Sequence, residues 1–231
     1  SFPALVALGL PPVVANATNT VALVPGSLAA AWAYRHELAT HRWLVWRFLT
    51  PSIIGGLVGA VLVLAAPAQV FEMIVPWLVL GATLLVAFKS NIRDAIQRAH
   101  PSTAESATGR HRTASLAILA MAVYGGYFGA GIGMITLAVL ALVTALDIHE
   151  MNAVKALIAS TVNGAAAALF LCRGTPHLPT ASLMALGVMS GGYVGAKLAR
   201  RTNAKVVERI IVAIGIAMTL LLLWRWLSQS N

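Results

Sequence analysis

Long apolar stretches, separated by short polar ones, run along almost the whole chain. They fall at residues 2–14, 16–34, 51–66 and 71–88, and again at 114–130, 131–146, 151–172, 180–198 and 206–227. Most are close to the roughly 17–25 residues that an α-helix needs to cross a bilayer. The pattern therefore predicts an all-α polytopic membrane protein.

Glycine and proline interrupt the first of these stretches. Residues 2–14 are short for a span and contain Gly-Leu-Pro-Pro at 9–12, which suits a re-entrant segment or half of a hairpin. Pro25-Gly26 predicts a kink or a break in the helix at 16–34.

The strongest interruption lies at residues 124–133 (YGGYFGAGIG), where the nine residues from 125 to 133 hold five glycines. Glycine lets two backbones approach closely, or lets a helix break. Broken backbone at membrane depth is tolerated only where it is buried in protein or lines a polar cavity. We predict a break at which Gly129, Gly131 and Gly133 expose helix ends. Simple notches for helix packing are the alternative.

Composition and charge place the chain in a bilayer. Of its 231 residues, 59% are hydrophobic and only 10% charged, against about 25% charged in a soluble domain. The net charge is +9, and thirteen of the sixteen Lys and Arg fall in windows 35–47, 89–112 and 197–209. Such windows are typical of cytoplasmic loops. Because no soluble domain is predicted to carry a basic face, we expect the lipid bilayer rather than nucleic acid as partner.

The two halves of the chain are related by a shift of 136 residues. The shift places Asn16-Ala17 on Asn152-Ala153, and GGLVGA at 55–60 on GGYVGA at 191–196. Agreement at two such sites in one register predicts an internal repeat. Residues 1–90 form the first transmembrane repeat, 91–113 a cytoplasmic linker, and 114–231 the second transmembrane repeat.

The basic loops predict that the repeats are inverted. Loop 35–47 is basic in the first half, whereas its equivalent at 173–179 has only one Arg and one His; the basic loop of the second half is 197–209 instead. Equivalent loops then face opposite sides, and broken helices near the midplane form the site, as in many secondary transporters. The equivalent of 124–133 would precede Ser1, so we expect the first repeat to lack its N-terminal part here, and that part to carry its own glycines.

Polar residues recur at matching places in the two halves. Asn16, Thr18 and Asn19 stand in the first, and the second offers Asn152, Lys155, Thr161 and Asn163. Asn16 and Asn19 are one helical turn apart, as are Asn152 and Lys155, so each pair shares a face. Amides, a cation and free helix N-termini together favour the oxygens of a small anion. We predict that these seven residues, with the three glycines of the break, bind the substrate.

Each of these residues also has a structural interpretation. Asn16 and Asn152 suit N-caps, the two threonines suit intrahelical hydrogen bonds, and Lys155, one turn into its helix, suits an interfacial cation. Asp147, His149 and Glu150 are predicted to form a polar loop between helices, with proton handling as the alternative.

No enzyme motif is present in the sequence. His149-Glu150 does not begin a metal-binding HExxH motif, because Ala153 stands where the second His would be. GxSxG, CxxC and phosphate-loop patterns are absent too. We expect no catalysis, no cofactor and no metal.

At the residues discussed above, the chain resembles the sulfite exporter TauE/SafE family of membrane permeases. The resemblance rests on GLPPVVANATN, on YGGYFGAGIG followed by MNAVKALIASTVNG, and on GGLVGA and GGYVGA. It implies export of a small sulfur-containing anion such as sulfite, sulfoacetate, thiosulfate or another organosulfonate. It also implies a multi-pass protein of the bacterial inner (plasma) membrane.

Three functions remain open from the sequence. The first is a secondary transporter working by alternating access, either as a single chain or as a homo-oligomer. The second is a passive anion channel built on the same half-helices. The third is a membrane scaffold or assembly factor that transports nothing, which predicts no cavity between the repeats.

Overall fold

The computed structural model describes residues 2–40, 42–88, 107–144, 146, 148–199 and 204–229. Within these residues all regular secondary structure is α-helical. The helices are α1 (Phe2–Ala7), α2 (Pro12–Ala33), α3 (Arg35–Thr40), α4 (Arg42–Ala65), α5 (Ala68–Ala87), α7 (Ala107–Tyr127), α8 (Ile132–Val143), α9 (Ile148–Cys172), α10 (Leu178–Ala199) and α11 (Ala204–Gln229). The prediction of an all-helical chain is confirmed.

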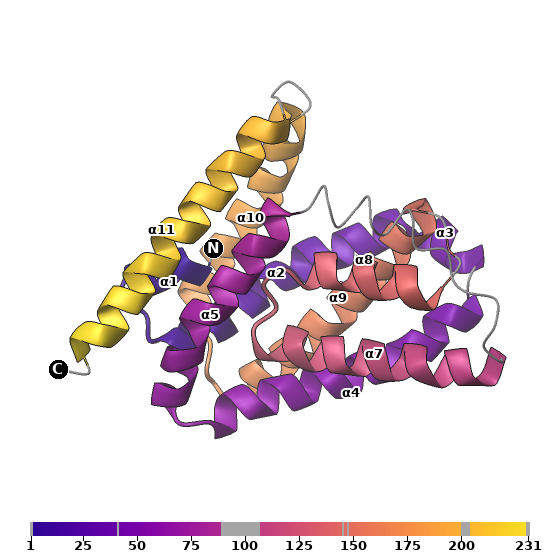
Figure 1. Cartoon of the computed structure of the whole chain (residues 1–231), viewed down its shortest axis with the longest axis horizontal. Helices are drawn as coiled ribbons and strands as arrows, with labels where there is room; N and C mark the ends of the chain where they lie inside the picture. Colours follow the sequence, from indigo (N-terminus) through magenta and orange to yellow (C-terminus); the bar gives the residue numbers. More distant parts are fainter. Residues whose placement is uncertain are drawn as a thin grey trace.

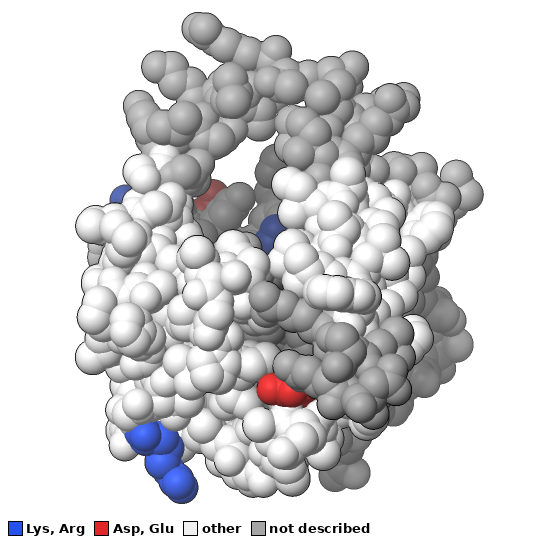
Figure 2. Space-filling model, turned by 90° about the vertical axis from the view of Figure 1, so that its left-hand side faces the viewer, with Lys and Arg blue, Asp and Glu red and all other residues white. Residues whose placement is uncertain are grey.

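Four helices of the described chain are long and apolar enough to cross a membrane. They lie at Pro12–Ala33, Arg42–Ala65, Ala68–Leu85 and Glu150–Cys172. Figure 2 shows that the face carrying α5 and α11 is almost entirely uncharged over its described surface. On α11, Ile214 and Leu220 are both exposed. Exposed apolar side chains over a wide face are what lipid tails solvate.

Three expectations about local structure are wrong. Residues 35–40 and 42–47 are not a loop: they form α3 and the start of α4. Helix α2 does not break at Pro25, because a proline removes only one helical bond, whereas ending the helix in lipid would expose several polar groups; a kink there stays a prediction. Within the predicted linker, residues 107–113 belong to α7 and residues 91–106 lie outside the described chain, so the linker stays a prediction. Since α9 begins at Ile148, Glu150 is helical rather than in a loop; Asp147 and the side chain of His149 are not described.

Basic side chains lie over tryptophan rings at the end of α2 and at the start of α4. The Arg35 guanidinium lies 5.4 Å from the ring centre of Trp32, and that of Arg47 lies 5.2 Å from the ring centre of Trp43. Trp32 and Trp43 are exposed. Tryptophan beside a cation is typical of the membrane–water boundary. The basic window therefore belongs to helix ends at that boundary.

The helices pack around the central pair α2 and α9. Helix α4 packs against α7 and α9, α10 against α2, α5 against α11, and α8 against α7 and α9. In Figure 1, α5, α10 and α11 lie on the left and α4, α7 and α8 on the right, with α2 and α9 between them. The two helices that carry the predicted polar residues are thus in direct contact.

Glycines set the close approach of α4 and α7. A Cβ on Gly55 would lie 2.5 Å from Ala122 Cβ, and one on Gly56 would lie 3.0 Å from the Val162 carbonyl oxygen of α9. Real Cβ atoms essentially never show the first distance, and the second is tighter than nine in ten real Cβ contacts. The GGLVGA sequence is therefore a packing surface for α7 and α9.

Helix boundaries follow the 136-residue shift. Adding 136 to the first residues of α2, α4 and α5 gives 148, 178 and 204, the first residues of α9, α10 and α11. The contacts follow the same correspondence, in which α2, α4 and α5 match α9, α10 and α11. The contact of α4 with α9 corresponds to that of α10 with α2, and the pairs α2–α9 and α5–α11 each join two corresponding helices. Sequence register, helix starts and helix contacts are those that a repeat would give, and the inverted repeat itself stays a prediction.

Candidate functional site

A break between two helices is the centre of the candidate site. Helix α7 ends at Tyr127 and α8 begins at Ile132. Between them Gly129 and Gly131 both have φ of 75°, the left-handed region that favours glycine. Helix α8 has 12 residues, about 18 Å of rise, too short to cross the hydrocarbon core. The predicted break is confirmed.

Two side chains hold the broken segment in place. Asn16 Nδ2 donates to the Tyr127 carbonyl oxygen at 3.0 Å, so that α2 satisfies a terminal carbonyl of α7. The Tyr124 hydroxyl donates to the Ala130 carbonyl oxygen at 2.5 Å, which ties the turn back to its own helix. Asn16 is only 1% exposed. It lies inside α2, five residues past Pro11, the N-cap, so its interpretation as an N-cap is wrong.

A cavity of about 430 Å³ opens beside this break. It is bounded by α2, the α7–α8 turn, α5, α9 and α11. Its lining residues are Phe2, Asn19, Thr20, Leu23, Val79, Ala82, Thr83, Phe128, Gly129, Ala130, Gly131, Ile132, Asn163, Ile214, Gly215 and Met218. Four residues predicted from the sequence are among them: Asn19, Gly129, Gly131 and Asn163.

A second polar group lies at the start of α8. Lys155 Nζ donates to Asn152 Oδ1 at 2.6 Å. A Cβ on Gly133 would lie 3.6 Å from Lys155 Cδ, so the lysine stem packs on the first turn of α8. Lys155 is the eighth residue of α9, two turns from its start, and Asn152 is also helical. The expectations of an N-cap at Asn152 and of a lysine one turn into its helix are therefore wrong.

Two predicted residues lie apart from these groups. Thr18 is fully buried, and its Oγ1 accepts a hydrogen bond of 2.9 Å from the His177 backbone amide. That bond fastens the α9–α10 connection to α2, which is a structural role. Thr161 is half-buried in α9 and is not among the residues that line the cavity.

The sequence analysis missed Thr20 and Thr83, which both line the cavity. A signal was available, because the 136-residue shift places Thr83 on Thr219, both of which are buried. Each donates to the carbonyl four residues earlier, Thr83 to Val79 at 2.8 Å and Thr219 to Gly215 at 2.9 Å. The shift therefore offered a signal for Thr83, whereas it places Thr20 on Ala156 and offered none for Thr20.

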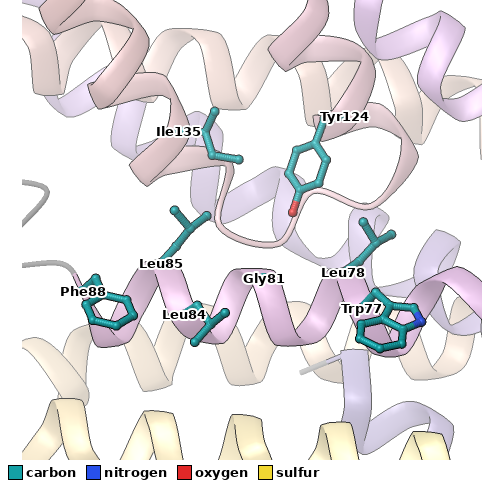
Figure 3. A pocket seen from close by; sticks show the side chains of 8 residues that line it. All are labelled: Trp77, Leu78, Gly81, Leu84, Leu85, Phe88, Tyr124 and Ile135. Carbon is teal, nitrogen blue, oxygen red and sulfur yellow. The ribbon is translucent and has the colours of Figure 1, made fainter.

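An apolar groove lies on the outer side of the same turn. Figure 3 shows Trp77, Leu84 and Phe88 on α5, with the Tyr124 ring facing α5 from α7. Trp77 and Phe88 are largely exposed. The groove is lined almost only by carbon, so lipid tails suit it and a small anion does not.

Comparison with known proteins identifies the family. The profile described as "Sulfite exporter TauE/SafE" matches residues 1–222. The chain belongs to the TauE/SafE family. This TauE/SafE protein is 24% identical to a "Probable membrane transporter protein" of Haemophilus influenzae, over 95% of this chain and 83% of that protein.

Two further relatives carry similar names. "Probable membrane transporter protein ORF9" of Sinorhizobium sp is 26% identical over 96% of this chain and 83% of its own length. "Probable membrane transporter protein YfcA" of Escherichia coli K12 is 24% identical over 97% of this chain and 81% of its own length. No solved structure matches the chain. Family and helices make it a multi-pass membrane protein, and its bacterial relatives fit the inner membrane.

Proposed function

We propose that this TauE/SafE protein is a secondary transporter of a small sulfur-containing anion. The observation that carries the proposal is the break between α7 and α8, which faces a cavity and has a lysine packed on the N-terminal turn of α8. A helix N-terminus presents unpaired N–H groups and about half a positive charge. Such an end binds anionic oxygens.

The anion site is proposed at the start of α8. Gly131 and Gly133 have no side chains that would keep an anion away from the backbone at this helix end. Lys155 supplies a full positive charge, and Asn152 accepts a hydrogen bond from the lysine amine. Asn163 adds an amide from the cavity wall. Sulfite, thiosulfate, sulfoacetate and other organosulfonates all present several oxygens on one sulfur, which suits several convergent donors. The family name, which refers to sulfite, supports this class.

Alternating access is proposed to follow from an inverted repeat. The matched helix starts and the exchangeable helix contacts support two related halves. In such folds the site lies where the halves meet, and rocking of one half exposes it to either side. The cavity is lined by Asn19 of the first half and Asn163 of the second. A cavity between the halves favours transport over the scaffold interpretation, which expected none.

Counterflow in proteoliposomes tests the proposal. Vesicles are loaded in turn with sulfite, sulfoacetate and thiosulfate, and uptake of the labelled anion is followed. We expect saturable exchange of at least one anion by the unaltered protein. Lys155→Ala should reduce exchange at least about tenfold, since it removes a charge-assisted hydrogen bond of 1.5–3 kcal/mol or so.

A matched control uses another cation of the same protein. Arg173 is exposed in the α9–α10 connection, away from the cavity, so Arg173→Ala should exchange normally. Flux without exchange would indicate the channel instead. If no anion moves while both variants fold, the transporter proposal is wrong.

A further inference from the structure

Helix α2 carries two unpaired hydrogen-bond acceptors near the break, Asn19 in the cavity wall and Asn16 one turn before it. Asn16 Oδ1 and Asn19 Oδ1 are buried, and neither has a hydrogen-bond partner among the described residues. Asn16 and Asn19 are 1% and 8% exposed. Leaving a buried polar atom unpaired costs about 1–3 kcal/mol. Two such atoms one turn apart on one helix indicate that something absent from the protein itself satisfies them.

The orientation of Asn16 decides what that ligand is. Its Nδ2 is committed to the Tyr127 carbonyl oxygen, so its Oδ1 has no freedom to exchange places with the amide nitrogen. Oδ1 can only accept hydrogen bonds or bind a cation. It is held at the C-terminal end of α7, where carbonyl groups gather about half a negative charge.

The two hydroxyls in the cavity have the same preference. The Thr20 hydroxyl donates to the Asn16 carbonyl oxygen at 2.9 Å, and the Thr83 hydroxyl donates to the Val79 carbonyl oxygen at 2.8 Å. With their protons committed, both oxygens meet a ligand as acceptors. Among the described residues that line the cavity there is no Lys, Arg, Asp, Glu or His. The lining therefore favours a cation and offers no side chain that would carry a proton.

We propose that a small monovalent cation of the Na⁺ type binds at the C-terminal end of α7, with Asn16 Oδ1 and Asn19 Oδ1 as ligands and Thr20 Oγ1 beside them. Hard cations take oxygen ligands, and ends of broken helices bind Na⁺ in other transporters. The inference rests on the proposed function in one respect: the cation at the end of α7 would offset the charge of an anion at the start of α8. The two charges would then move together.

Thermal unfolding of the purified full chain in detergent tests the site without transport. The midpoint is measured in NaCl, KCl, LiCl and choline chloride at equal concentration, so that the anion is constant. We expect Na⁺ to raise the midpoint over choline by about 5–10 °C at a hundredfold excess over its Kd. Asn19→Ala should raise the half-saturating Na⁺ concentration at least about tenfold, because it removes one ligand.

Thr18→Val is the matched control, since Thr18 is a buried polar residue of the same helix whose oxygen is bonded to the His177 amide. It should lower the midpoint but leave the half-saturating Na⁺ concentration unchanged. Equal midpoints in NaCl and choline chloride, or an unaltered Na⁺ response in Asn19→Ala, would overturn the cation site.

Counterflow of sulfite in NaCl and in choline chloride then separates this inference from the proposed function. A Na⁺-specific midpoint shift in a protein that moves no anion keeps the cation site and refutes the transporter. Exchange that is equal in both salts, with no midpoint shift, keeps the transporter and refutes the cation site.

Discussion

The contact between α4 and α7 makes a sharp prediction, because it has no room for a methyl group. A Cβ on Gly59 would lie 2.5 Å from the Tyr127 backbone nitrogen and closer still to the Val123 carbonyl oxygen. All of these neighbours are backbone atoms of α7, so no flexible side chain can move aside. Gly59→Ala therefore has to push the two helices apart.

The size of the effect follows from that distance. An ordinary contact needs at least 3.4 Å, so α4 and α7 must separate by about 1 Å, and overpacking of this kind costs about 1–3 kcal/mol. For a chain of this length, 1 kcal/mol corresponds to about 2–4 °C in unfolding midpoint. Gly59→Ala should therefore lower the midpoint by about 2–12 °C. Because Tyr127 is the last residue of α7, the break and anion exchange should be disturbed as well.

Gly81→Ala is the matched control. Gly81 also lies inside a long helix, α5, but a Cβ there would meet nothing within 4 Å. Alanine in a helix is better than glycine by about 0.5–1 kcal/mol, so this variant should be as stable as the unaltered protein or slightly more so. Thermal unfolding of the two variants in the same detergent measures the difference. Equal midpoints would refute the close contact of α4 and α7.

Two other residues make independent predictions. Gly131→Ala forces a residue with a Cβ into a left-handed conformation at φ of 75°, at a cost of about 1–2 kcal/mol. The midpoint of thermal unfolding of this variant should fall by about 2–8 °C, and its anion counterflow should be reduced. Unchanged values would contradict the geometry of the break. Thr18→Val removes the acceptor of the His177 amide and should destabilise by about 1–3 kcal/mol. Its half-saturating sulfite concentration in counterflow should stay unchanged, and a raised value would return Thr18 to the binding site.

Much of the architecture was predictable from the sequence because the bilayer allows few structures. Long apolar stretches with few charges have to be helices, since lipid cannot satisfy backbone polar groups. The glycines of residues 124–133 predicted the break, because glycine adopts backbone conformations at which a helix can end. The shift of 136 residues also predicted which helices correspond, and the order and contacts of the described helices agree with that prediction.

The roles of single polar residues were not predictable from sequence spacing. Asn16, Thr18 and Asn19 lie within four residues of one helix, yet Asn16 supports the end of α7, Thr18 fastens the α9–α10 connection and Asn19 lines the cavity. What each side chain does depends on which distant backbone group lies opposite it. Only the packing of α2 against its neighbours decides that.

The GGLVGA sequence shows the same division. Its glycines indicated that another helix approaches its backbone closely, but they did not say which helix. The partners are α7 on one side and α9 on the other, and the contacting residues of both are more than 60 residues away in the chain. Local composition determined that these segments are helices in lipid and where one of them breaks. Tertiary contacts decided which atoms meet, because hydrogen bonds and van der Waals contacts act over a few ångströms in space and carry no information about separation along the chain.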